Sequence, residues 1–187
     1  MTQLTRRRFN RRLALALGLG LGSVALGAPA QTPVAEAPLA GGRAAGQATM
    51  RFLGLEIYQA QLWVSPGFEP EQYAALPLAL ELTYQREFSG SAIAKRSLDE
   101  MKRIGEFSSE QGTRWLQQLQ ALLPDVKRGD RLLGLHQPGV GASFKMGGKT
   151  LGTLNDPLFS RLFFGIWLSP ATSEPKLRQA LITLAAP

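Results

Sequence analysis

The apolar run from Gly46 to Val64 restricts this chain to folds that contain a buried β-sheet. Its residues alternate as they do in a strand, because Leu53, Leu55 and Ile57 share one face. From Tyr58 onward the phase changes, and the apolar residues fall on the other face. A strand that is covered on both faces, or a bulge near Tyr58, would explain this change. We expect the run to open the folded domain as its first core strand.

The clearest strand signal covers Leu78 to Tyr84, where apolar and polar residues alternate so that one face packs and the other faces water. Such alternation is typical of an antiparallel sheet. Three short apolar segments follow later in the chain, separated by Pro-Gly and Gly-Gly pairs, which indicates a meander of hairpins. These predicted strands cover residues 132–136, 142–146 and 150–154.

Capping residues and apolar stripes predict four helices. The second has a glutamine three residues after its N-cap serine, which is the spacing of a capping box. The third, from Phe159 to Trp167, is so apolar that we expect it to be buried on most sides. The predicted N-caps are Ser91, Ser108, Asp156 and Ser173. Strands and helices together predict an α+β fold, an antiparallel β-sheet backed by a layer of helices in an open-faced sandwich.

The first thirty residues resemble an export signal rather than part of the fold. Met1 to Arg12 carries five arginines and no acidic residue, an apolar run follows, and Ala28-Pro29-Ala30 supplies the small residues that a signal peptidase reads. Thr5-Arg6-Arg7-Arg8-Phe9 matches the twin-arginine pattern. We therefore expect residues 1–30 to be a twin-arginine-type signal peptide. A Sec signal or an uncleaved anchor is the alternative.

The rest of the chain divides into a leader and one domain. Residues 31–45 are rich in Pro, Ala and Gly without periodicity, so we expect a flexible leader there and a single domain over 46–187. Processing after Ala30 would place the protein in the periplasm. No later segment reaches the roughly 20 apolar residues of a spanning helix, so no stable membrane span is expected after cleavage.

The positive charge of the chain comes mostly from the predicted signal. The 21 basic and 14 acidic residues give a formal charge of +7, but removing the five signal arginines leaves 16 basic residues and a charge of +2. The remaining basic pairs alternate with acids along the chain, as in a solvated face. This pattern does not favour a nucleic-acid partner.

The residue inventory limits the chemistry that the domain can perform. The chain has no cysteine and one histidine, His136, so disulfides, thiol catalysis and cysteine-type zinc sites are excluded, and no metal or cofactor is expected. His136 lies in a predicted strand just before a turn. We interpret it as a partly exposed strand residue rather than as a catalytic base.

Tyr58 is the best candidate for a buried polar site because it is the one polar group on an apolar strand face. A buried tyrosine hydroxyl needs a hydrogen-bond partner, which is either a ligand or a group of the protein itself. Three arginines are available as cations near such a site. Arg51 lies in the same apolar run, and Arg96 and Arg103 belong to the first predicted helix.

The motifs of this run resemble those of the chalcone isomerase-like family, in particular its bacterial exported branch. The family's Gly-x-Gly-x-Arg motif begins at Gly46, with Ala48 in place of its second glycine and Met50 in place of its arginine. The aromatic run that follows ends here in Tyr58-Gln59-Ala60-Gln61-Leu62-Trp63. The similarity continues through residues 80–84, 97–101, 124–130 and 163–169.

This resemblance implies an antiparallel sheet backed by helices, with a cleft beside the Tyr58 strand. Plant members close a chalcone with an arginine and a hydrogen-bonded tyrosine network, and non-enzymatic members bind fatty acids in the same cleft. Arg51 is one position from Met50 and points to the opposite strand face unless a bulge re-aims it. A preorganised donor for the developing charge is worth about 3–4 kcal/mol, so a missing arginine argues against the isomerase reaction.

Three functions are therefore open. The favoured one is an exported protein that binds a small hydrophobic or amphipathic ligand, fatty-acid-like, in a cleft beside the Tyr58 strand, without catalysis. Its expected ligand contacts are Tyr58, Arg51, Arg96 and Arg103. The second is an isomerase, an intramolecular lyase in which Tyr58 acts with one of these arginines. The third is an envelope protein-interaction module that docks on a second protein through a partly exposed Phe159–Trp167 helix.

Overall fold

The structure is a computed structural model, and it describes residues 38–183. The predicted signal peptide, residues 1–30, and residues 31–37 of the predicted leader lie outside the described residues. The description that follows concerns the described part alone. It contains one β-sheet, four α-helices and a short 3₁₀ helix, Pro70–Gln72.

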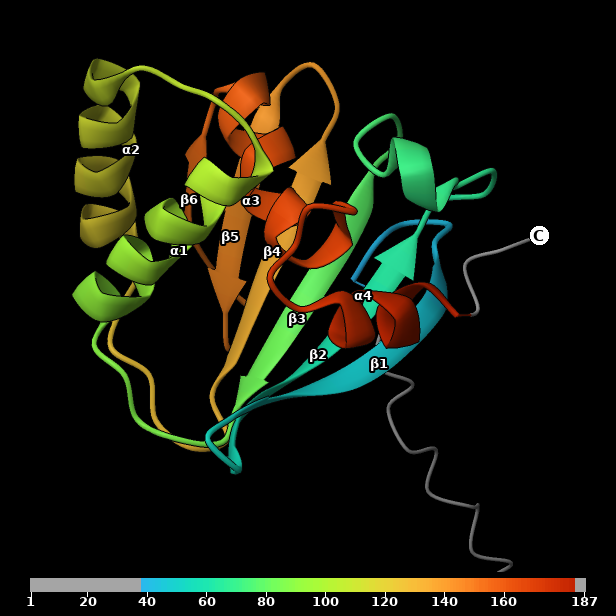
Figure 1. The fold of residues 1–187 in the computed structure, drawn as a ribbon, viewed down its shortest axis with the longest axis horizontal. Coiled ribbons are helices and arrows are strands. Elements are labelled where there is room, and N and C mark those ends of the chain that lie inside the picture. Colours follow the sequence, from blue (N-terminus) through green and yellow to red (C-terminus); the bar gives the residue numbers. More distant parts are fainter. Residues whose placement is uncertain (1–37, 184–187) are drawn as a thin grey trace, which may run out of the picture. The chain divides into compact units, whose positions relative to one another are not determined.

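The sheet has six strands in the order β1-β2-β3-β4-β5-β6, and every neighbouring pair is antiparallel. Consecutive strands pair throughout, so the sheet is a meander (Figure 1). The later strands agree with the predicted positions to within a residue or two. The strands are β1 (Arg43–Phe52), β2 (Leu55–Val64), β3 (Leu78–Tyr84), β4 (Arg131–Gln137), β5 (Gly141–Met146) and β6 (Lys149–Leu154).

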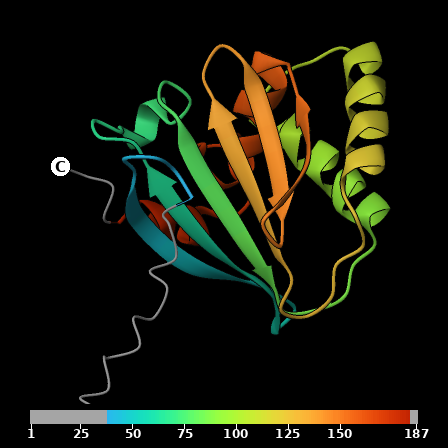
Figure 2. The ribbon, with the colours of Figure 1, turned by 180° about the vertical axis from the view of Figure 1, so that it is seen from behind.

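The helices lie on one side of the sheet and the opposite face is bare of helices in the described part, as Figure 2 shows from behind. Helices α1 and α2 connect β3 to β4, and α3 and α4 follow β6. This arrangement confirms the predicted α+β open-faced sandwich. The helices are α1 (Gly90–Ile104), α2 (Ser109–Leu122), α3 (Pro157–Leu168) and α4 (Pro175–Ile182).

The apolar run from Gly46 to Val64 forms a hairpin, and its prediction as one strand is wrong. The chain turns at Leu53 and Gly54, which both have positive φ, +49° and +79°. Two residues with positive φ match the twist of a two-residue hairpin turn. The turn was missed because its first position holds a leucine, where asparagine or aspartate is the usual signal.

Strand β1 begins at Arg43, so residues 43–45 of the predicted leader belong to the sheet. The glycine at position 46 has a packing role inside this strand. A Cβ there would lie 2.3 Å from the carbonyl oxygens of Ala180 and Leu181, which is an impossible contact. Gly46 therefore allows the backbone of α4 to approach β1 directly.

A β-bulge interrupts the pairing of β1 with β2 close to Tyr58. Met50 pairs with Tyr58, but the next residue, Arg51, pairs with Glu56, so Ile57 is the extra residue. One of the two explanations for the phase change, a bulge near Tyr58, is thereby confirmed. The bulge lies on β2, and β1 keeps its normal alternation between Met50 and Arg51.

Side-chain caps begin three of the four helices. The predicted capping box at Ser108 is present, and the Asp156 carboxylate accepts hydrogen bonds from the first turn of α3. The cap of α1 is Ser89, two residues before the predicted Ser91, because its hydroxyl accepts the bond from Ala92 N. Ser173 does not cap α4 either: Glu174 holds that position, without a side-chain cap bond.

Helix α3 supplies the centre of the core. Its aromatic residues Phe159, Phe163, Phe164 and Trp167 are all buried, and the centroids of successive rings lie 5.4–5.5 Å apart. Burial on most sides was expected from its composition and is confirmed, with Arg161 on the exposed side. The hypothesis of an interaction module that docks through this helix loses its basis, since the aromatic residues are not available to a partner.

His136 is buried, contrary to the expectation of a partly exposed side chain. Its Nδ1 lies 2.6 Å from the Ser160 hydroxyl and its Nε2 lies 3.1 Å from the Ala74 carbonyl oxygen. The strand periodicity was read correctly, but α3 covers the face on which His136 lies. Burial lowers the pKa of His136, and the bond to Ala74 opposes this shift.

Within residues 38–183 the helices are short or mixed in character, and none combines the length and hydropathy that crossing a bilayer requires.

Candidate functional site

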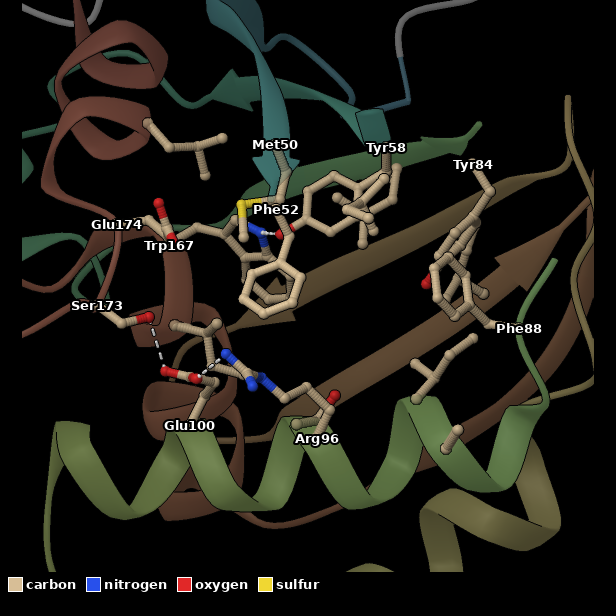
Figure 3. Close-up of a pocket in the computed structure, with 18 of the residues that line it drawn as sticks. Met50, Phe52, Tyr58, Tyr84, Phe88, Arg96, Glu100, Trp167, Ser173 and Glu174 are labelled. Carbon is tan, nitrogen blue, oxygen red and sulfur yellow. Dashed lines mark hydrogen bonds and ion pairs between the residues drawn. The ribbon is translucent and has the colours of Figure 1, made fainter. Parts of the chain in front are cut away.

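A cavity of about 350 Å³ lies between the sheet and the helices, in the size range of small-ligand sites, roughly 300–1,000 Å³ (Figure 3). Its wall is mostly apolar and comes from β1, β2 and β3 on one side and from α1, α3 and the start of α4 on the other. The residues that carry polar groups into it are Tyr58, Tyr84, Arg96, Ser97, Glu100, Ser173 and Glu174. Such a cavity suits a largely apolar molecule with one polar group.

Tyr58 lies in the cavity wall, as the predicted site requires. Its hydroxyl accepts a hydrogen bond of 3.0 Å from Nε1 of Trp167, and its own proton has no acceptor among the described residues (Figure 3). Burial raises the pKa of Tyr58 to about 12, although the bond from Trp167 acts in the opposite direction. At neutral pH the hydroxyl is therefore protonated, and it can donate to a ligand but cannot remove a proton.

The bulge at Ile57 explains how β2 contributes two consecutive residues to the cavity wall. In a regular strand, neighbouring side chains point to opposite faces. Because the bulge adds a residue to β2, the consecutive residues Ile57 and Tyr58 both line the cavity. The bulge thus aims Tyr58 without changing which residues of β1 face inward.

Tyr84 is a second buried tyrosine in the wall, and the sequence interpretation did not select it. It pairs with Tyr58 across β2 and β3, and the two rings meet edge to face with centroids 6.1 Å apart. Its hydroxyl has no hydrogen-bond partner within residues 38–183, and burial raises its pKa. A hydroxyl donor that faces a cavity without a partner is available to a ligand.

The charged groups of the cavity form one cluster. The Glu100 carboxylate is almost fully buried, and it contacts Nη2 of Arg96 at 2.6 Å and accepts a 2.8 Å hydrogen bond from the Ser173 hydroxyl. Glu174 lies beside this cluster (Figure 3). Arg96 is thus already partnered, and an acidic ligand must share it with Glu100.

Arg51 and Arg103 do not line the cavity. Arg51 is exposed and forms an ion pair with Glu56, and Arg103 is exposed and lies 3.7 Å from Oε2 of Glu100, the oxygen that also accepts the bond from Ser173. Met50 and Phe52 of β1 face inward instead. The condition under which Arg51 could replace the motif arginine, a bulge that re-aims it, is not met because the bulge lies on the partner strand.

Two further arrangements carry no recognisable chemistry. His136 and Ser160 form a buried pair outside the cavity, and the Ser160 hydroxyl also lies 2.9 Å from the Gly141 carbonyl oxygen. A catalytic pair needs access to substrate, which this pair lacks. In the described part of the chain no three His, Cys, Asp or Glu side chains converge as metal ligands would.

Comparison with known protein families shows which family this chain belongs to. A family model described as chalcone isomerase-like matches residues 46–183. The chain belongs to the chalcone isomerase-like family. The resemblance inferred from the sequence motifs is thereby confirmed.

Two known proteins are similar to this chain, one in sequence and one in structure. An uncharacterized protein of Haemophilus influenzae is 27% identical over 146 residues, which cover 78% of this chain and 70% of that protein. The crystal structure of a fatty-acid binding protein of Arabidopsis thaliana superposes with a TM-score of 0.61 at 12% identity, covering 76% of this chain and 87% of that chain. At this identity the likeness shows the shared fold.

Several cavity residues escaped the sequence interpretation. Trp167 was assigned to the core, Glu100 is one of several charged residues within α1, and Ser173 and Glu174 lie just before the first turn of α4. None of these positions gives a local signal of a site. Their only common property is their position in space. Tyr84 alternates with the other inward residues of β3 and could have been selected by the same argument as Tyr58.

Proposed function

We propose that this chalcone isomerase-like protein is a non-catalytic binder of a small hydrophobic or amphipathic ligand, fatty-acid-like in having an apolar chain and one polar end. The observation that carries the proposal is the apolar cavity with its polar groups gathered at Tyr58 and the Arg96–Glu100 cluster. The fatty-acid binding of the Arabidopsis protein with the same fold supports this choice.

Among the described residues, the cavity lining contains no cation besides Arg96, which argues for ligand binding rather than catalysis. Met50 occupies the inward position of β1, Arg51 points away, and Arg96 is held by Glu100. An enolate-like charge would meet no unpaired guanidinium in the described cavity, and such a donor is worth about 3–4 kcal/mol of barrier. We expect chalcone absorbance to decay at the buffer rate when micromolar protein is added. Protein-dependent decay would restore the isomerase alternative.

Three arginine variants test the binding site directly. A fluorescent fatty-acid analogue is titrated into the protein and into the variants Arg96→Gln, Arg51→Gln and Arg103→Gln. We expect Arg96→Gln to raise the dissociation constant about tenfold, the equivalent of roughly 1.4 kcal/mol for one charge-assisted hydrogen bond. Arg51→Gln serves as the matched control with unchanged affinity, and Arg103→Gln, which loses the 3.7 Å contact with Glu100, should have a smaller effect than Arg96→Gln.

Two results would contradict the proposal. The first is that no analogue binds and that mass spectrometry of protein purified from its own host shows no co-purifying lipid or aromatic molecule. The second is that binding occurs but responds equally to all three arginine variants, which would locate it outside the cavity.

We also propose that the protein is exported to the periplasm by the twin-arginine route. The proposal rests on Arg6-Arg7 and on Ala28-Pro29-Ala30, which lie outside the described residues. We expect an Arg6→Lys, Arg7→Lys double variant to accumulate as the unprocessed chain in cell fractions. Unchanged processing after Ala30 would instead indicate the Sec route.

A further inference from the structure

Tyr84 brings a second polar group into the cavity, apart from the cluster around Arg96. The residue is 3% exposed, and its hydroxyl has no hydrogen-bond partner within residues 38–183. In that part of the chain, every side-chain polar atom that is fully sealed from open space has a partner. The Tyr84 hydroxyl therefore opens onto the cavity, and the cavity is where this donor meets an acceptor.

The position of the Tyr84 side chain is fixed by contacts of its backbone and of its ring. The backbone N donates to the Asp130 carbonyl oxygen at 2.9 Å, and the carbonyl oxygen accepts from Gly129 N at 2.8 Å. The ring packs between those of Tyr58 and Phe88, with centroids 6.1 and 6.0 Å away. The hydroxyl is thus a preorganised donor at one point of the wall.

Tyr84 and the charged cluster lie at opposite ends of the cavity. Figure 3 shows Arg96 and Glu100 at one end and Tyr84 beside Phe88 at the other. The Arg96 side chain extends toward Glu100, with which it is paired at 2.6 Å, and away from Tyr84. Burial raises the pKa of Tyr84, Tyr58 adds to this shift, and no charged side chain of the described part contributes. The surroundings of the Tyr84 hydroxyl are therefore uncharged.

The two ends of the cavity favour different ligand groups. A carboxylate placed at Tyr84 would lose its water beside aromatic rings and would meet no cation, which is costly. At the other end it meets the Arg96 guanidinium. Because its pKa is raised, the Tyr84 hydroxyl is protonated at neutral pH and donates to a neutral oxygen.

A plain alkyl chain does not supply such an oxygen. Water that enters the free cavity can accept the bond from Tyr84, but a chain of methylene groups displaces that water and offers no acceptor in return. The lost hydrogen bond lowers the affinity for such a chain. An oxygen carried by the chain at this point restores the bond.

We infer that the ligand is an oxygenated acyl chain, with its acidic end at Arg96 and a neutral keto or hydroxyl oxygen further along that accepts a hydrogen bond from Tyr84. The inference rests on the proposed function and makes it more specific. Tyr84 then determines which acyl chains are selected, and Arg96 binds the end that all of them share.

Calorimetric titration of the full chain tests this selection. The probes are palmitic acid and keto-palmitic acids in which the ketone stands at successive positions, because a ketone only accepts hydrogen bonds. We expect one isomer to bind about three- to tenfold more tightly than palmitic acid, the range for one neutral hydrogen bond. Tyr84→Phe should remove this preference and make palmitic acid bind more tightly, since no donor is then left unsatisfied.

Tyr73→Phe is the matched control. It also removes a largely buried tyrosine hydroxyl, but this one donates to the Arg161 carbonyl oxygen at 3.0 Å and lies outside the cavity. The preference for the keto acid should remain in this variant. Tyr84→Phe should keep the melting temperature of the ligand-free protein, because the hydroxyl that it removes has no partner within residues 38–183.

Infrared spectra of an isotope-labelled ketone report the bond itself. The carbonyl stretch of the bound keto acid should lie at lower frequency in the wild-type protein than in Tyr84→Phe, since accepting a hydrogen bond weakens the carbonyl bond. Equal frequencies in the two proteins would overturn the inference.

The titrations separate failure of the inference from failure of the proposed function. The inference is wrong if palmitic acid binds but no keto isomer exceeds it, or if the preference survives in Tyr84→Phe; ligand binding as proposed then stands. A preference that Tyr73→Phe removes equally would also overturn it. If neither palmitic acid nor any keto acid binds, the proposed function fails and the inference fails with it.

Discussion

At the scale of single residues, the Tyr58–Trp167 hydrogen bond links the two walls of the cavity. Trp167 is buried and donates to the Tyr58 hydroxyl at 3.0 Å. Tyr58→Phe should lower the free energy of unfolding by about 1–3 kcal/mol, because the indole N–H loses its acceptor in a buried position. Urea denaturation measures the change.

A double-mutant cycle isolates this bond from the effect of size. In a Trp167→Phe background no buried donor is left unsatisfied, so adding Tyr58→Phe should cost much less than it does alone. Equal costs in both backgrounds would show that the bond does not contribute to stability.

His136 should make stability depend on pH in the opposite sense to a histidine that gains an acidic partner. Burial lowers its pKa below the ordinary value of 6.5, so the unfolded chain takes up the proton first as the pH falls. The free energy of unfolding is therefore highest above about pH 6.5 and decreases as the solution becomes more acidic. Urea denaturation between pH 8 and pH 5 measures this slope.

His136→Asn is the control, since it removes the titrating ring. The variant should be less stable at pH 8 but show a flatter profile over the same range. A wild-type slope that the variant reproduces would assign the pH dependence to carboxylates elsewhere in the chain.

At the scale of elements, the contact of α4 with β1 depends on Gly46. A Cβ at this position would lie 2.3 Å from two backbone carbonyl oxygens of α4, which cannot move independently of the helix. Gly46→Ala should therefore destabilise the fold by at least the roughly 1–3 kcal/mol of an overpacked site. Gln47→Ala, at the exposed neighbouring position, is expected to change the urea midpoint little.

The β1–β2 turn offers the opposite case, a substitution that should stabilise. Leu53→Asn places a residue that tolerates positive φ at a position whose side chain is 86% exposed. We expect the melting temperature to rise by a few degrees, since about 1 kcal/mol corresponds to roughly 2–4 °C in a domain of this size. A fall in melting temperature would mean that Leu53 packs within the fold.

At the scale of the whole domain, the cavity links ligand binding to stability. Its walls come from the sheet and from three helices, so a bound molecule holds both layers together. Palmitic acid at about 100 times its dissociation constant should add about 2.7 kcal/mol to the free energy of unfolding and raise the melting temperature by about 5–10 °C. Acetate has the carboxylate without the chain and should have no effect.

Much of the architecture could be predicted from local patterns in the sequence. Alternation located β3, paired glycines and prolines located the turns between β4, β5 and β6, and the Ser108 and Asp156 caps set the starts of α2 and α3. These signals act over a few neighbouring residues, where hydrogen bonding and side-chain periodicity are decided locally. The Leu53–Gly54 turn was missed because its leucine is a costly choice for such a conformation.

The candidate site was predicted only in part, because a cavity collects residues that are distant in the chain. Strand periodicity was enough to select Tyr58, and the helix pattern made Arg96 available. Which of the arginines lines the cavity depended on which face of β1 lies under the helices and on the direction of α1 across the sheet.

The sequence by itself determined the α+β layering and the family, since both rest on local periodicity and on motifs that can be read along the chain. Only the tertiary structure decided that Met50 rather than Arg51 faces the cavity, that Glu100 already holds Arg96, and that Leu53 at the β1–β2 turn stays exposed. The physical reason is that burial and charge pairing arise between elements far apart in the chain, and no local pattern encodes their distances.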